Sequence, residues 1–407
     1  MREIRILFIV NSHVEIDNHL PIIKCLNELR DNIHIDILIA NDRFYVYTDS
    51  FNYENLKAFQ IKTVGNFHKS KILKAILNNK LSVEQNSLRL KHKFLNGLFY
   101  YLKTHALKHF NFAKADVAKD YNFVFATIGI LEAVKKLGRK ASLNRITFSP
   151  NDMQKIVLLP ETYSQFKSKE QEFPVTSREN PIASQSFHAI LICKAIKSDI
   201  SFSNKAQNII EIGWPRYSKT WCEKIDVFYG GPENNSGPKK ILFLPIKASP
   251  DGNWVREQIR KHISFAINYA KKERLDLLIK RHPRCNVPKS YWRKVMGNLK
   301  LSMRLDTIKC IIESNVIYTP GTSLLGHVLW GDKVIILDDA WADSATQSFI
   351  YKEYCHTFDD KLKLIPPKKK SLEKKAIFLQ DEFQLGLDAV SFDTKLRNQL
   401  SKIITIH

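Results

Sequence analysis

Short apolar runs alternate with amphipathic segments along this chain, and that alternation most constrains how it can fold. Residues 4–10 (IRILFIV) form an apolar run, residues 18–30 carry a helical pattern, and residues 33–40 (IHIDILIA) alternate as in a strand. A strand, a helix and a second strand in this order are typical of a βαβ unit, which requires a parallel sheet. The start of the chain therefore predicts an α/β domain.

The same alternation continues toward the middle of the chain. It predicts strands at 122–127 and 155–160, a helix at 88–110, and a helix at 187–197 that leads into a strand at 199–203. Each apolar run is short, as expected for strands that are buried inside a parallel sheet.

Residues 229–239 (YGGPENNSGPK) interrupt the pattern, because they contain Gly, Pro, Asn and Ser and almost no apolar side chain. Such a composition is typical of a linker. The alternation then restarts, with expected strands at 240–246, 275–280, 315–319 and 333–338 and expected helices at 254–272, 290–298 and 323–330.

A chain of 407 residues has room for two or three domains at roughly 150 residues each. The fold class predicted is α/β, with two doubly wound Rossmann-like domains that face a central cleft. The first domain covers residues 1–228, the linker 229–238 and the second domain 239–386; a helix within 387–407 is expected to return to the first domain.

The composition is ordinary except for its charge. The chain has 63 Lys and Arg against 41 Asp and Glu, a net charge of +22. Such a surplus indicates a polyanionic partner: a nucleic acid, an anionic membrane surface or a phosphorylated substrate. The sequence carries no helix-turn-helix signature, RNA-binding aromatic motif or zinc-ligand spacing, which argues against a nucleic-acid partner.

Cysteine usage and hydropathy favour a soluble cytoplasmic protein. The six cysteines form no CxxC pair, and no apolar run approaches the ~18 residues of a membrane span. The basic segment 361–375 (KLKLIPPKKKSLEKK) fits attraction to anionic headgroups, which would place the protein peripherally on the inner membrane. The same segment also fits an ordinary solvated face.

Functional residues are expected directly after the predicted strands, because open α/β sheets bind ligands at the carboxyl ends of their strands. Lys280, Arg281, His282, Pro283 and Arg284 follow one such strand. Three cations and an imidazole suit a phosphate or diphosphate. A solvated basic turn remains the alternative.

A second candidate lies between a predicted strand and a predicted helix. Gly321 permits a tight turn, and Thr322 and Ser323 can cap the helix that follows. The free backbone N–H groups of such a helix start bind anions. Helix capping alone would also explain these residues.

Three further residues are candidates from their positions. Glu161 follows the predicted strand KIVLLP and suits a general base, or simply a surface acid at a helix start. Asp251 lies in the loop after the first strand of the second domain, within a Pro-Asp-Gly turn signature. Arg216, in GWPR, suits an anionic group across the cleft, or an ordinary loop.

The order of these motifs resembles bacterial GT-B glycosyltransferases of surface polysaccharide assembly. The matching segments are GWPR, the linker, KKILFLP, KRHPR and TPGTS. In members that use CMP-activated sugars, a His-Pro motif and a later Ser/Thr motif contact the nucleotide phosphate. His282-Pro283 and Thr322-Ser323 are similar to these motifs in order and spacing. The expected donor contacts are Lys280, Arg281, Pro283, Arg284, Gly321, Thr322, Ser323 and Arg216. His282 is expected to be catalytic, because it would stabilise the departing CMP.

Within this group the carboxylates look most like those of the retaining β-Kdo transferases (Kdo is 3-deoxy-D-manno-oct-2-ulosonic acid). That resemblance implies that Asp251 acts as nucleophile and that Glu161 assists. It implies transfer of Kdo, or a related acidic ketosugar, from a CMP donor to a lipopolysaccharide or capsule glycan, with no metal and no cofactor besides the donor. The expected partners are the nucleotide sugar and a glycan or lipid-linked glycan acceptor.

Three alternatives remain open at this stage. One is a sialyltransferase, although the acidic pair before glycine that those enzymes carry is replaced here by Pro160-Glu161-Thr162. Another is a CDP-glycerol-type phosphotransferase. The non-enzymatic alternative is a nucleic-acid-binding protein, which rests on the net charge alone.

Overall fold

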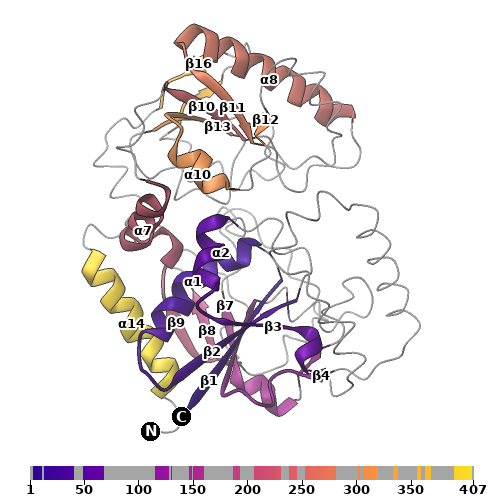
Figure 1. Cartoon of the computed structure of the whole chain (residues 1–407), viewed down its shortest axis with the longest axis vertical. Helices are drawn as coiled ribbons and strands as arrows, with labels where there is room; N and C mark the ends of the chain where they lie inside the picture. Colours follow the sequence, from indigo (N-terminus) through magenta and orange to yellow (C-terminus); the bar gives the residue numbers. More distant parts are fainter. Residues whose placement is uncertain are drawn as a thin grey trace.

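The computed structural model describes two parallel sheets with helices packed on them (Figure 1). The described residues are 3–11, 13–40, 49–67, 115–127, 130, 146–148, 150–159, 187–192, 206–230, 238–244, 253–280, 301–302, 306–319, 333–337, 355–358, 363–367 and 389–405.

The first sheet has seven strands in the order β3-β2-β1-β5-β7-β8-β9, and each neighbouring pair is parallel. Its strands are β1 (Ile4–Val10), β2 (Ile33–Ile39), β3 (Gln60–Thr63), β5 (Phe123–Thr127), β7 (Ile156–Leu159), β8 (Phe187–Ile192) and β9 (Ala206–Glu211). The order reverses between β1 and β5, as in the doubly wound Rossmann arrangement.

The helices of this domain are α1 (His13–Asn27), α2 (Ser50–Leu56) and α7 (Lys219–Tyr229), with 3-10 turns η2 (Val64–Phe67), η4 (Pro150–Lys155) and η9 (Pro215–Tyr217). Ser218 caps α7 by accepting a 3.3 Å hydrogen bond from the Trp221 amide. Gly230 ends α7 at φ 93°, a left-handed conformation that favours glycine.

The second sheet has five parallel strands in the order β12-β11-β10-β13-β14. They are β10 (Lys240–Phe243), β11 (Asp276–Lys280), β12 (Leu301–Ser302), β13 (Val316–Thr319) and β14 (Val334–Leu337), and the helices are α8 (Asn253–Glu273) and α10 (Thr307–Ile312). Two short pairs complete the strands: β4 (Ala115–Asp116) with β6 (Ile146–Thr147), and β15 (Thr357–Phe358) with β16 (Leu364–Ile365).

These two sheets confirm the predicted fold class, α/β with two doubly wound domains. The apolar strand residues explain the layers, since successive side chains point to opposite faces of a sheet. In β1, Phe8 belongs to an apolar cluster on one face, whereas Ile9 belongs to a second cluster on the other.

The predicted helix at 187–197 is wrong where the structure describes it, because residues 187–192 form strand β8. This strand pairs with β7 on one side and β9 on the other, and it is buried. An apolar run that is buried on both faces has no clear two-residue period, so its pattern does not separate a strand from a helix. The predicted strand at 199–203 lies outside the described residues.

The last helix, α14 (Ala389–Thr405), packs on the first domain, beside α1 and α7 (Figure 1). Its Leu400 and Ile403 are fully buried in the cluster that also holds residues of α1. The Ile403 carbonyl lies 3.2 Å from the ring Nε2 of His188 on β8, and Arg397 lies 2.6 Å from Glu28.

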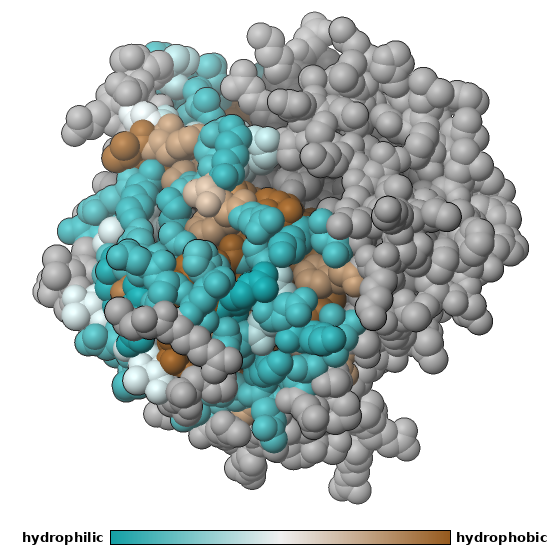
Figure 2. All heavy atoms as spheres, turned by 60° about the horizontal axis from the view of Figure 1, so that its bottom comes forward, coloured by the Kyte–Doolittle hydropathy of each residue, from teal (hydrophilic) through white to brown (hydrophobic). Residues whose placement is uncertain are grey.

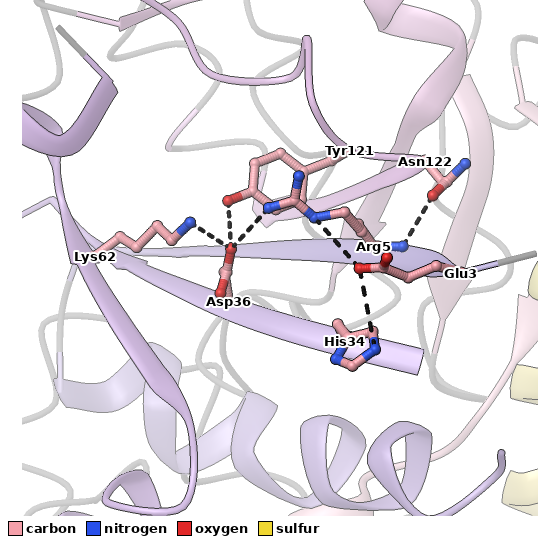
Figure 3. A network of polar contacts seen from close by, with 7 residues as sticks. All are labelled: Glu3, Arg5, His34, Asp36, Lys62, Tyr121 and Asn122. Atoms are coloured by element: carbon pink, nitrogen blue, oxygen red, sulfur yellow. Dashed lines mark hydrogen bonds and ion pairs between the residues drawn. The ribbon is translucent and has the colours of Figure 1, made fainter. Parts of the chain in front are cut away.

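A polar network ties β1, β2 and β3 to the segment before β5 (Figure 3). At its centre Asp36 accepts a 2.6 Å hydrogen bond from the Tyr121 hydroxyl and pairs with Lys62 at 2.7 Å. Arg5 lies 3.8 Å from the same carboxylate. These partners offset the cost of placing a carboxylate inside the first domain.

The face at the bottom of Figure 1 carries mainly hydrophilic side chains among its described residues, with apolar residues in small groups (Figure 2). In the described part of the chain, no helix combines the length and the apolar character that a membrane crossing requires.

Candidate functional site

Three of the sequence motifs follow neighbouring strands at the switch point of the second sheet. The strand order reverses between β10 and β13, and β11 lies on the other side of β10. In the sequence, Asp251 comes after β10, His282 comes two residues after β11, and Thr322 comes three residues after β13. Because all these strands are parallel, their carboxyl ends share one edge of the sheet.

Most motif residues themselves lie outside the described residues, so their roles stay predictions. They are Glu161, Asp251, Arg281, His282, Pro283, Arg284, Gly321, Thr322 and Ser323. Lys280 and Arg216 are described, and the structure gives both a specific environment.

Lys280 is the last residue of β11 and is only 5% exposed. Burial lowers the pKa of its ammonium group, whereas Cys310 and the carboxylates of Asp49 and Asp306 act in the opposite direction. Lys280 therefore carries its positive group at the carboxyl edge of the second sheet, beside acids of both domains. Its contact with a donor phosphate stays a prediction.

Arg216, in η9, is buried in the first domain at 2% exposure. Its Nη1 donates a 2.6 Å hydrogen bond to Asn18 on α1, and its guanidinium lies over the Tyr217 ring at 4.8 Å. Among the described residues, its Nε and Nη2 find no hydrogen-bond partner. The described contacts thus direct Arg216 toward α1, and the donor contact expected for it stays a prediction.

Asp17, on α1, lies close to this arginine. Burial raises the pKa of Asp17 to about 6, against the opposing effects of the Arg216 charge and of a hydrogen bond donated by the Asn52 side chain. A carboxyl group that titrates near pH 6 can hold or release a proton near neutral pH. Its ionisation is linked to that of Asp49, which lies at the contact between the domains, because the Asp17 charge adds to the burial that raises the pKa of Asp49.

The two domains meet through α2 and α10, the helices that follow Asp49 and Asp306 (Figure 1). Asp49 accepts a 2.7 Å hydrogen bond from the Thr307 amide of the second domain. In return, Asp306 accepts hydrogen bonds from Ser50 of the first domain, at 2.8 Å from its amide and 2.6 Å from its hydroxyl. Burial raises the pKa of Asp49 well above its usual range, and the Asp17 and Asp306 charges add to this effect.

Sequence reasoning missed Asp17, Asp49 and Asp306. Asp49-Ser50 and Asp306-Thr307 each carry the pattern of a helix start, an acidic cap followed by the first helical residue. That pattern predicts local caps, and only the three-dimensional structure shows that the partners come from residues more than 250 positions away. Within the described residues, these acids do not form a group that could hold a metal ion.

Comparison with known proteins finds no matching family model and no match among curated proteins. Solved structures with a similar chain path have low sequence identity. UDP-GlcNAc 2-epimerase from Methanocaldococcus jannaschii, in complex with UDP-GlcNAc and UDP, is 13% identical with a TM-score of 0.47, covering 99% of this chain and 100% of that chain.

Two further structures have similar values. The S. aureus MnaA-UDP co-structure is 12% identical with a TM-score of 0.47, covering 98% of this chain and 91% of that chain. Medicago truncatula UGT71G1 complexed with UDP-glucose is 11% identical with a TM-score of 0.44, covering 99% of this chain and 98% of that chain.

Proposed function

We propose that this chain is a glycosyltransferase that takes its sugar from a nucleotide-activated donor, bound at the carboxyl edge of the second sheet. The observation that carries the proposal is the placement of three motif segments after β10, β11 and β13, the strands around the switch point. A basic His-Pro segment and a Gly-Thr-Ser segment after adjacent parallel strands suit the phosphate of a nucleotide.

The donor proposed is CMP-Kdo or a related CMP-activated acidic ketosugar, on the resemblance of KRHPR and TPGTS to transferases that use CMP donors. His282, Thr322 and Ser323 would stabilise the departing CMP by hydrogen bonds to its phosphate. Lys280, Arg281 and Arg284 would supply positive charge to the phosphate and to the sugar carboxylate.

The reaction proposed has two displacements. A carboxylate oxygen of Asp251 bonds to the anomeric carbon while the bond from that carbon to the phosphate oxygen breaks, and CMP leaves with the electron pair. An acceptor hydroxyl then attacks the same carbon, Glu161 takes the hydroxyl proton, and the bond to Asp251 breaks. Two inversions give net retention of the anomeric configuration.

The acceptor proposed is a glycan of lipopolysaccharide or capsule, carried on a lipid at the inner membrane. The net charge of +22 supports this part of the proposal, because an anionic membrane attracts cationic surfaces. Segment 361–375 (KLKLIPPKKKSLEKK) is rich in lysine, and its positive charge would be attracted to the same membrane surface.

A donor panel tests the function. Purified protein is incubated with CMP-Kdo, CMP-sialic acid, CDP-glycerol and UDP-sugars, together with glycan acceptors, and the product anomers are identified by NMR. Transfer from CMP-Kdo with retention supports the full proposal. Transfer only from a UDP-sugar would support glycosyltransferase activity but refute the CMP donor. Transfer from none of these donors would refute the proposed function.

Two variants test the assigned residues. Asp251→Ala should abolish transfer, and mass spectrometry of the wild-type protein with donor alone should find the sugar attached to Asp251. Asp31→Asn is a matched control, since Asp31 lies exposed in the turn before β2. An Asp251→Ala protein that keeps most of its activity would refute the double displacement.

A further inference from the structure

The helix starts of α2 and α10 face each other across the two domains, and neither is capped by its own aspartate. Asp49 and Asp306 occupy the cap positions of these helices, where an aspartate ordinarily accepts from amides of its own first turn. Both side chains make no such bond. Each instead accepts from the first residue of the opposite helix, at 2.7 Å from Thr307 and at 2.8 Å from Ser50.

This exchange satisfies amides that a helix cannot satisfy itself. The first amides of a helix have no acceptor within it, so Ser50 and Thr307 depend on outside partners. In α2 the next amide, Phe51, donates to the Tyr229 hydroxyl at the end of α7, at 3.2 Å. The first turn of α2 is thus held by groups from α10 and from the helix that leads toward the second domain.

Asp49 lies buried beside two other acids, so its carboxyl group needs hydrogen-bond donors. Asp49 is 6% exposed, so leaving its carboxylate without partners would be costly. The charge of Lys280 acts on Asp49 against the repulsion from Asp17 and Asp306. Beside these polar groups, the apolar cluster runs from Trp221 and Ile225 of α7 into α10.

We propose that Asp49 and Asp306 form a reciprocal capping latch, which holds the two domains in contact and opens as one unit. Its bonds run in opposite directions: the Thr307 amide donates to Asp49, whereas the amide and the hydroxyl of Ser50 donate to Asp306. A displacement that breaks one therefore moves the other out of range. After opening, each aspartate is free to cap its own helix, which limits the cost of separation and makes the contact a two-state element.

The latch is tested by a substitution that removes its donors and keeps the helix. Ser50→Pro deletes both the amide and the hydroxyl that bind Asp306, and proline is favoured at the first helical position. Asp49, with φ −65° and ψ 153°, already has the extended backbone that a residue before proline adopts. The chain offers a matched control in Lys219→Pro, at the first position of α7 after Ser218 with φ −62° and ψ 148°.

The readout is amide hydrogen exchange at Thr307, which lies 257 residues from the substitution and reports the other bond of the latch. Ser50→Pro should speed exchange at Thr307 about tenfold or more, because loss of both Ser50 bonds to Asp306 releases the reciprocal bond from Thr307 to Asp49. X-ray scattering should show a larger radius of gyration. Lys219→Pro should leave both measurements as in the wild type.

Unchanged exchange at Thr307 in Ser50→Pro would overturn the proposal, as would equal acceleration in Lys219→Pro. If Ser50→Pro does not fold, Ser50→Ala removes only the hydroxyl bond and should speed exchange by a smaller factor; no acceleration would again overturn the latch. These measurements need no substrate, so their outcome is independent of the proposed function.

Discussion

Replacing Asp17 by asparagine should change how the stability of the protein depends on pH. The folded protein holds the pKa of Asp17 at about 6, against 3.8 for the ordinary side chain. The folded state therefore binds this proton more tightly than the unfolded state, and the free energy of unfolding falls as pH rises from about 4 to 6. At about 1.36 kcal/mol per pKa unit, the loss is of order 3 kcal/mol.

Asp17→Asn removes the ionisation and keeps an oxygen that can accept from Asn52. The free energy of unfolding of Asp17→Asn minus that of the wild type should therefore rise by roughly 3 kcal/mol between pH 4 and pH 7. Urea denaturation followed by circular dichroism at pH 4, 5, 6 and 7 measures this difference. Asp31→Asn, at an exposed turn, is the control. A difference between Asp17→Asn and wild type that is constant with pH would refute the reasoning.

Two further predictions concern stability. Leu400→Ala should lower the free energy of unfolding by about 2–5 kcal/mol, because it leaves a cavity where α14 packs on the first domain. Thermal denaturation measures this loss, with the exposed Asn398→Ala as the control. Equal melting temperatures for the two variants would contradict the prediction. Asp36→Ala should cost about 2 kcal/mol through loss of its charged hydrogen bonds to Tyr121 and Lys62. Glu3→Ala, which removes only exposed pairs, should cost less than about 1 kcal/mol in the same assay, and comparable losses would argue against a special role for Asp36.

The architecture of the chain could be predicted because the apolar pattern within each short segment indicates whether that segment forms a strand or a helix. The apolar runs 4–10, 240–246 and 315–319 contain β1, β10 and β13. The restart of the alternation after a linker-like segment indicated a second sheet, and two doubly wound sheets are present. Local apolar periodicity suffices here because each strand lies inside a parallel sheet.

Strand β8 shows where this reasoning fails. Residues 187–192 (FHAILI) run without a polar period into further apolar residues, so a helix and a buried strand fit equally well. Its pairing with β7 and β9 makes this segment a strand. Such pairing depends on residues distant in the sequence, so the local pattern does not reveal it.

The polar contact between the domains could not be predicted for the same reason. Asp49 and Asp306 look like ordinary helix caps in the sequence, and their exchange depends on how the domains meet. The raised pKa of Asp17 likewise arises from burial, which outweighs the opposing charge of Arg216, a residue 199 positions further along the chain. By contrast, local patterns locate the strand ends that precede His282, Asp251 and Thr322, and the roles of these residues stay predictions.

Nucleotide binding tests the central claim most directly. Titration calorimetry with CMP, and with UDP and CDP for comparison, should show one site per chain, with CMP bound most tightly. His282→Ala should weaken CMP binding about tenfold or more, through loss of a hydrogen bond to the phosphate, while Asp31→Asn binds as the wild type does. Binding of no nucleotide, or CMP affinity unchanged in His282→Ala, would contradict a donor site at the carboxyl edge of the second sheet.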